Sequence, residues 1–191
     1  MEVHRVGESS RWIPYCGEAP GPEVWLSRWS LDPVLGTCLV LLALALWRPA
    51  AGRVSTPGRL CSLRCAWGLT VLLYVSPLCA LSSTFFTVRV IHHIALVLVM
   101  APLLAFGWEP WLRRLPTPLW TATAIAAVTF WTWHAPAPYA AALSSVSIYA
   151  LMQFTLLASA TAFWIAVRRS GPVAAMGATG PPRCRWDCWA R

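Results

Sequence analysis

The stretch from Val88 to Gly107, VRVIHHIALVLVMAPLLAFG, predicts the fold class of this chain. It is twenty residues long, and its charge-capable side chains, Arg89, His92 and His93, all lie near one end. A helix rises about 1.5 Å per residue, so this segment can cross the roughly 30 Å of bilayer hydrocarbon. Polar side chains inside a membrane span are costly, and by default they indicate a function. The histidine pair is therefore the first candidate for a functional site.

The composition indicates a polytopic membrane protein. Of the 191 residues, 58% are hydrophobic and only 12% are charged, and the apolar residues come in long blocks. A soluble domain typically carries about 25% charged residues. The net charge of +8 comes entirely from arginine, since the fifteen basic residues include no lysine. Because these arginines fall between the apolar blocks, membrane topology explains them better than nucleic-acid binding does.

Five apolar segments are expected to cross the membrane, giving an all-α polytopic helix bundle. Residues 1–32 are expected to form a polar tail at the outer membrane surface, residues 33–169 the transmembrane domain, and residues 170–191 a short C-terminal tail. The spans are expected near residues 33–47, 66–86, 88–107, 118–134 and 148–167. Pro77 should kink the second span. The segment Ala135-Pro136-Ala137-Pro138 should end the fourth span, because it cannot easily continue a helix, and a short uncharged link to Ser147 should lead into the fifth span.

The distribution of arginines predicts the orientation of these spans. With the N-terminus outside, the inside segments carry eight arginines, and the outside connections between spans carry only Arg89. This is the bias that the positive-inside rule requires, so we expect the N-terminus outside and the C-terminus inside. The first thirty residues hold no apolar run behind a basic segment, so no cleavable signal peptide is expected.

This topology brings polar groups to one depth at the outer side. His92 and His93 lie at the outer end of the third span, His134 at the outer end of the fourth, and Tyr149 and Gln153 at the outer start of the fifth. Antiparallel helices joined by short connections are usually neighbours. We therefore expect these side chains to gather between three helices.

Histidines from two different helices can form a metal site, because neutral imidazole is a good ligand for copper, zinc and haem iron. His93 and His134 are the first candidates, and His92 is the third. Consecutive residues stand about 100° apart on a helix, so only one of His92 and His93 can face the bundle fully. The alternative is structural, since a histidine at an interface can cap a helix or bind water. Met100 is expected to serve packing.

The seven cysteines are odd in number, and their spacing predicts no disulfide framework. Cys61 and Cys65 form a CxxxC pattern in a loop rich in arginine, and Cys184 and Cys188 form another in the tail. Such a pair can bind copper, but cysteines also pack as small apolar residues in membrane proteins.

A set of short segments occurs in order between about residue 15 and residue 170. The segments are Tyr15-Cys16-Gly17, Arg28-Trp29-Ser30-Leu31-Asp32-Pro33, Ser76-Pro77-Leu78-Cys79-Ala80-Leu81-Ser82-Ser83, His92-His93, Ala101-Pro102-Leu103-Leu104-Ala105-Phe106-Gly107, Phe130-Trp131-Thr132-Trp133-His134 with Pro136, and Ile148-Tyr149-Ala150-Leu151-Met152-Gln153. Each is weak alone, but as a set they resemble the CtaG-type multi-pass cytochrome c oxidase assembly factors of bacteria.

The resemblance implies a multi-pass protein of the bacterial inner membrane that helps to build respiratory cytochrome c oxidase. Its implied partners are oxidase subunits or other assembly factors and membrane lipid, and copper is its suspected metal. Many members carry an i, i+4 histidine pair in the third span, where this chain has Arg89 and His93. A similar pair in the fifth span corresponds to Tyr149 and Gln153 here. A site of four imidazoles is therefore not expected, and any metal role rests on His93 and His134 with His92.

The leading hypothesis is thus a non-enzymatic assembly factor with an outward-facing histidine cluster that handles copper. One alternative is a membrane redox protein that holds b-type haem between His93 and His134, and another is a small transporter. The sequence has no nucleophile–base arrangement, phosphate loop or paired carboxylates, and the expected spans contain no acid. No enzymatic activity and no nucleic-acid partner are expected.

The C-terminal segment, GPPRCRWDCWAR at residues 180–191, resembles neither a helix nor a membrane span. Members of the family usually continue into further apolar helices. Reverse translation in a neighbouring frame turns residues 183–191 into a run of small apolar residues suited to a membrane helix. We therefore expect a frameshift near residues 172–182, and an intact single reading frame on resequencing would reject it.

Overall fold

The computed structural model describes Tyr15 and residues 24–48, 56–109 and 118–175, and within these residues the regular structure is entirely helical. The predictions for most of the N-terminal tail, for Arg53, Arg113 and Arg114, and for the C-terminal tail with Cys184 and Cys188 lie outside the described residues.

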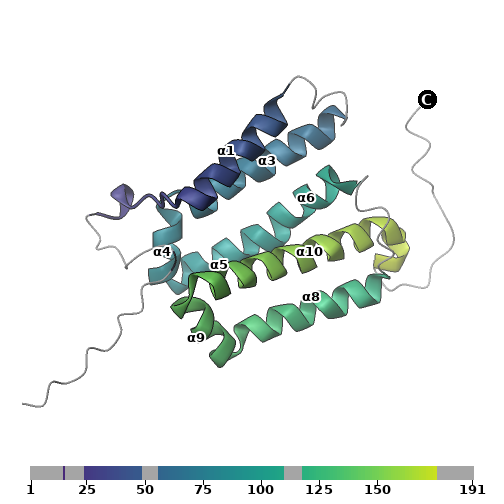
Figure 1. Ribbon diagram of the computed structural model, residues 1–191. Helices are drawn as coiled ribbons and strands as arrows, with labels where there is room; N and C mark the ends of the chain where they lie inside the picture. Colours follow the sequence, from purple (N-terminus) through teal and green to yellow (C-terminus); the bar gives the residue numbers. More distant parts are fainter. Residues whose placement is uncertain (1–14, 16–23, 49–55, 110–117, 176–191) are drawn as a thin grey trace, which may run out of the picture.

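The helices follow one another with short connections. In chain order they are η1 (Trp25–Ser27), α1 (Pro33–Trp47), α3 (Pro57–Tyr74), α4 (Leu78–Thr84), α5 (Phe86–Ile94), the π-helix η2 (Ala95–Met100), α6 (Ala101–Gly107), α8 (Leu119–His134), α9 (Pro136–Ser144) and α10 (Val146–Ala175). The helices α5, η2 and α6 follow end to end as one rod. Figure 1 shows α10 lying between this rod and α8, with α1 and α3 paired on the other side of the rod.

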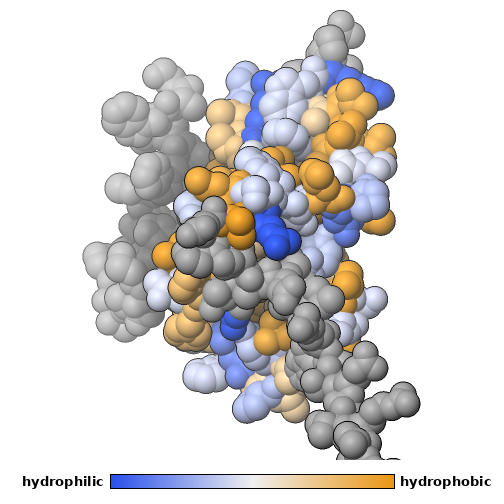
Figure 2. Space-filling view, turned by 90° about the vertical axis from the view of Figure 1, so that its left-hand side faces the viewer, coloured by the Kyte–Doolittle hydropathy of each residue, from blue (hydrophilic) through white to orange (hydrophobic). Residues whose placement is uncertain are grey.

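Two helices among the described residues are long and apolar enough to cross a membrane. They are Phe86–Gly107 and Val146–Ser170, with mean hydropathies of 2.1 and 1.7, and Pro33–Trp47 is apolar but shorter. Figure 2 shows apolar residues at many places on one face of the molecule. Exposed apolar side chains of this kind suit contact with lipid. The five-span arrangement and its orientation remain predictions.

The second expected span differs from the observed structure. Instead of one segment at residues 66–86, α3 ends at Tyr74 and α4 begins at Leu78. Pro77 has no N–H, so the predicted kink is a full break, and Ser76 Oγ accepts a hydrogen bond from the Leu78 N–H at 3.2 Å. Because α3 begins at Pro57, Cys61 and Cys65 lie on a helix, and their assignment to a loop was wrong.

The link between the fourth and fifth expected spans is also helical, which the sequence analysis did not predict. Pro136 stands at the start of α9, where a missing N–H costs nothing because it would have no partner in the helix. Similarly, α10 runs on to Ala175 instead of ending at Gly171 and Pro172. A proline close to a helix end removes only one of the last backbone hydrogen bonds.

Close packing around α10 and α3 holds the bundle together. The α10 helix packs against α6, η2, α8 and α9, whereas α3 packs against α1, α4 and α6. Leu73, Leu96 and Met100 form one buried cluster, so Met100 packs as expected. A Cβ atom on Gly107 would lie 2.4 Å from Leu63 Cδ2, so only glycine permits this approach of α6 to α3.

The π-helix η2 directly follows the turn that carries His92 and His93, and Pro102 lies at the start of the next helix, α6. Because Pro102 has no N–H, the preceding turn has a carbonyl without its usual helical donor. The indole Nε1 of Trp164 in α10 donates to the Val97 carbonyl at 2.8 Å. This bond ties α10 to the rod that carries His92 and His93.

Glu109 joins three segments at the end of the bundle away from the histidines. Its carboxylate lies 3.2 Å from Arg59 of α3 and 3.5 Å from Arg168 of α10. The Arg168 guanidinium also stands over the Phe106 ring at 4.7 Å. These contacts fix the ends of α3, α6 and α10 relative to one another.

Candidate functional site

All three histidines of the described residues lie at one end of the bundle. His92 and His93 belong to the last turn of α5, and His134 is the last residue of α8. The ring centroids of His93 and His134 are 5.7 Å apart, and those of His92 and His93 are 6.2 Å apart. The structure therefore brings together the two histidines that the topology had predicted to converge from different helices.

The tautomer of His134 follows from its surroundings. Its Nδ1 lies 2.7 Å from the Phe130 carbonyl oxygen, one turn earlier in α8. A carbonyl only accepts hydrogen bonds, so neutral His134 carries its proton on Nδ1 and keeps a lone pair on Nε2. Histidines that bind metals commonly donate their other ring N–H in this way. The ring is held further by stacking on Phe130 at 3.9 Å between centroids.

An apolar groove of about 620 Å³ runs past His93 and His134. Its apolar walls come from α5, η2 and α8 and comprise Phe86, Val90, Ile94, Val97, Leu98 and Phe130. His134 is exposed and His93 is partly buried, so the groove gives access to both rings from outside the bundle.

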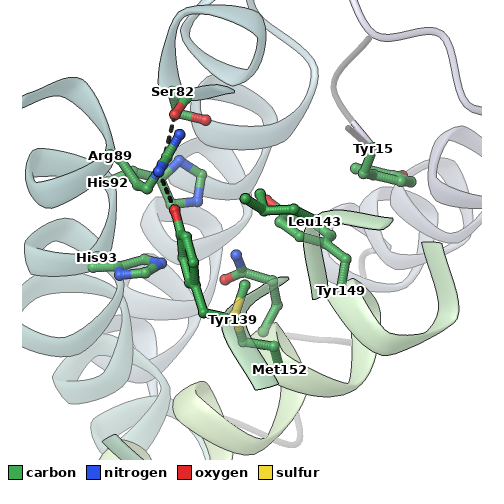
Figure 3. A pocket seen from close by; sticks show the side chains of 10 residues that line it. Tyr15, Ser82, Arg89, His92, His93, Tyr139, Leu143, Tyr149 and Met152 are labelled. Carbon is green, nitrogen blue, oxygen red and sulfur yellow. Dashed lines mark hydrogen bonds between the residues drawn. The ribbon is translucent and has the colours of Figure 1, made fainter. Parts of the chain in front are cut away.

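A smaller polar cavity lies on the inner side of His93, and we call it the chamber. It holds about 30 Å³ and is lined by Tyr15, Ser82, Arg89, His92, His93, Tyr139, Leu143, Tyr149, Met152 and Gln153 (Figure 3). Arg89 donates to the Tyr139 hydroxyl, and its Nε donates to the Ser82 carbonyl at 2.9 Å. His93 lines both cavities, as do Arg89 and Tyr139, so these three residues lie where the chamber and the groove adjoin.

His92 is the histidine that faces the interior. It is 4% exposed, its ring stands edge-on to Tyr74 at 5.1 Å, and neither ring nitrogen has a hydrogen-bond partner among the described residues. The sequence had left open which of His92 and His93 faces the bundle.

Comparison with known proteins gives a family for the chain. A family model described as cytochrome c oxidase caa3 assembly factor matches residues 38–181, about three quarters of the chain. The chain belongs to this family. No curated protein and no solved structure matches it. The matched region includes His92, His93 and His134 and, except for Tyr15, all residues that line the chamber and the groove.

The spacing of His93 and His134 can be compared with the spacing of two imidazoles that bind the same metal ion. Two imidazoles that share an ion through bonds of about 2.0–2.1 Å have ring centroids about 5–6 Å apart. The separation of 5.7 Å between His93 and His134 falls in this range. The described residues contain no group of three or more His, Cys, Asp or Glu side chains that could hold a metal. Structural zinc sites use four ligands, whereas a site with two imidazoles suits copper(I) better.

Tyr149 and Gln153 stand where the resemblance implies a second histidine pair, and here they build the chamber wall. The Tyr74 hydroxyl donates to Gln153 Oε1 at 3.0 Å, and Tyr149 also shares a hydrogen bond with Gln153. The Tyr15 ring stacks on Tyr149 at 5.2 Å. Tyr74 and Tyr139 could not be predicted from the sequence, because hydroxyl groups on separate helices carry no spacing signal.

Tyr15 also connects the chamber to the start of α1. Its side chain hydrogen-bonds Asp32, which caps α1 by accepting from the N–H groups of Val34 and Leu35 at 2.8 and 2.9 Å. Burial, and then the charge and hydrogen bond of Asp32, raise the pKa of Tyr15 to about 12. The Leu35 N–H is the main cause that lowers the pKa of Asp32.

The cysteines divide between the two ends of the bundle. Cys79, which is 1% exposed, is disulfide-bonded, and its partner lies outside the described residues. The expectation of no disulfide framework is therefore wrong for Cys79, because proximity in the fold and not spacing decides pairing. Cys61 and Cys65 are free and exposed near the start of α3.

Proposed function

We propose that this assembly factor crosses the bacterial inner membrane with its N-terminus outside and holds copper(I) between His93 and His134 at the outer face for cytochrome c oxidase. The observation that carries the proposal is the contact between these two rings, 5.7 Å apart, with a lone pair left on His134 Nε2 by the bond to Phe130. The ion would be bound by both imidazoles and reached through the apolar groove.

The available donor groups support copper(I) as the proposed ion. Two neutral imidazoles supply no charge, and the described residues add no carboxylate or thiolate to them. Such a set favours a monovalent ion of low coordination number over zinc, which prefers four ligands. Copper(I) also suits a factor for cytochrome c oxidase, the assembly for which the family is named.

The cysteines support the proposed orientation independently of the arginines. Disulfides persist in oxidising compartments and are rare in the cytoplasm. Cys79 is disulfide-bonded and lies one turn before Ser82, which lines the chamber. Cys61 and Cys65 are free and lie toward the other end. The histidine end would therefore face outward and the free thiols inward.

The haem alternative is not favoured by the geometry of the two rings. Axial imidazoles of a haem stand on opposite faces of the porphyrin. The centroids of His93 and His134 are 5.7 Å apart, which is shorter than the separation slightly above 6 Å of two imidazoles on opposite sides of one ion. No observation on the described residues favours the transporter.

The proposal is tested by deleting the gene and measuring assembled oxidase, its copper content and its activity in membranes. We expect all three to fall, and to return with the wild-type gene but not with His93→Ala or His134→Ala. Met100→Leu is the matched control, because it removes a buried thioether outside both cavities. Unchanged oxidase in the deletion strain would reject the proposal.

Orientation has its own test, in which a membrane-impermeant maleimide labels Cys61 and Cys65. We expect labelling only after the membrane is made permeable. Labelling of intact spheroplasts would reverse the proposed orientation.

A further inference from the structure

The buried ring of His92 is not explained by a structural role. Leaving a buried donor or acceptor without a partner costs about 1–3 kcal/mol, and both ring nitrogens of His92 are in this state among the described residues. Phenylalanine has a similar shape and would pack against Tyr74 without that cost. An imidazole at this position therefore indicates that its nitrogens meet a group that the described residues do not supply.

The chamber next to His92 restricts what can bind there. Its volume is about 30 Å³, and one water needs about 10–15 Å³ on this measure. It can therefore hold a bare ion or one or two waters, but not an organic ligand. Besides the two imidazoles its lining includes the thioether of Met152, which is 3% exposed. Imidazole and thioether are donors that copper(I) accepts.

The spacing of the rings links this chamber to the proposed copper site. The centroids of His92 and His93 are 6.2 Å apart, and those of His93 and His134 are 5.7 Å apart. Two imidazoles on opposite sides of one ion, with bonds of about 2.0–2.1 Å, reach a centroid separation slightly above 6 Å. The separation of His92 and His93 therefore suits an ion held in a nearly linear N–Cu–N arrangement. The shorter separation of His93 and His134 suits a bent arrangement. His93 belongs to both pairs and lines both cavities.

We propose that copper(I) has two alternative positions, one between His92 and His93 in the chamber and one between His93 and His134 beside the groove. This inference rests on the proposed copper binding at His93. Because His93 serves both positions, the chain holds one ion at a time. The ion moves by exchanging His92 for His134 while His93 stays bound, and copper stays in the +1 state throughout.

Arg89 disfavours a divalent ion more than it disfavours copper(I). Its guanidinium lines the chamber, one turn before His93. Coulomb repulsion is proportional to charge, so a monovalent ion meets half the repulsion that a divalent ion meets at the same place. Such repulsion also limits the affinity, which suits an ion that must be passed on.

The test uses the full-length protein in detergent, loaded with copper(I) in competition with a colorimetric chelator. The variants are His93→Ala, His134→Ala, His92→Phe and the double variant with His92→Phe and His134→Ala. We expect one copper(I) per chain in the wild type and in each of the two single variants at positions 92 and 134. Their affinities should lie within about tenfold of the wild type, which is about 1.4 kcal/mol. The double variant and His93→Ala should lose the ion.

The outcomes separate the two proposals. If His134→Ala alone loses the ion, copper binding by His93 and His134 stands and the second position falls. If the double variant retains the ion as well as His134→Ala does, His92 is not a ligand and the chamber holds water only. If the wild type binds no copper(I), both proposals fail.

X-ray absorption on copper-loaded His134→Ala gives a second measurement that does not depend on affinity. We expect two nitrogen ligands in a nearly linear arrangement. Should His92→Phe fail to fold, His92→Leu replaces it in the same series.

Discussion

The substitution His92→Phe should stabilise the metal-free protein, which is unusual for a buried polar residue. The two ring nitrogens of His92 have no partner among the described residues, and each such group costs about 1–3 kcal/mol. Phenylalanine keeps the edge-on contact with Tyr74 and removes both costs. The phenylalanine ring is slightly larger than imidazole, and the neighbouring chamber of about 30 Å³ can accommodate the additional volume. We expect a net gain of about 1–2 kcal/mol after a small repacking cost.

The assay is thermal unfolding of metal-free protein in detergent, followed by the fluorescence of the thirteen tryptophans. For a chain of this length, 1 kcal/mol changes Tm by about 2–4 °C, so Tm should rise by about 2–8 °C. Tyr74→Phe is the matched control. It removes the 3.0 Å hydrogen bond to Gln153, which is 8% exposed, and should lower Tm.

The reasoning would be refuted if His92→Phe lowered Tm as much as Tyr74→Phe does. The nitrogens of His92 would then be satisfied in the free protein, for example by water in the chamber. The imidazole would need no further explanation, and the second copper position would lose its premise.

Three further predictions concern the bundle itself. Gly107→Ala should cost about 1–3 kcal/mol, because its Cβ would lie 2.4 Å from a Leu63 methyl group, and unfolding in denaturant would measure the loss. Trp164→Phe should cost about 1–3 kcal/mol by leaving the Val97 carbonyl without its 2.8 Å donor, and a Tm equal to that of the wild type would contradict this. Asp32→Ala should cost about 1 kcal/mol at neutral pH by removing the cap of α1. Since folding lowers the pKa of Asp32, this difference should be complete above the unfolded value of about 3.9 and shrink as the pH falls below it.

Much of the architecture could be predicted from local features of the sequence. The long apolar block at residues 88–107 forms one continuous rod, and the breaks around Pro77 and after His134 occur near the predicted places. The helical state of residues 136–144 was missed because proline is read as a helix breaker, although the first turn tolerates it. The family resemblance read from short motifs agrees with the family model.

The position of the three histidines at one end of the bundle was also predictable, since it depends only on the order and direction of the helices. The different surroundings of the three histidines could not be predicted from the sequence. The tautomer of His134 depends on Phe130, and the burial of His92 depends on Tyr74, which comes from a different helix.

Sequence alone determined that this chain forms long apolar helices, that its arginines favour one orientation, and that His92, His93 and His134 share one end. These features depend on length, hydropathy and chain direction, which are local or additive properties. Only the tertiary structure decided that His92 faces the interior, that His93 lines both the chamber and the groove, and that the ring of His134 lies against that of His93. In a membrane bundle the lipid-facing side is as apolar as the core, so hydropathy does not mark which face of a helix is buried. Which face is buried depends on how the side chains of neighbouring helices pack against it.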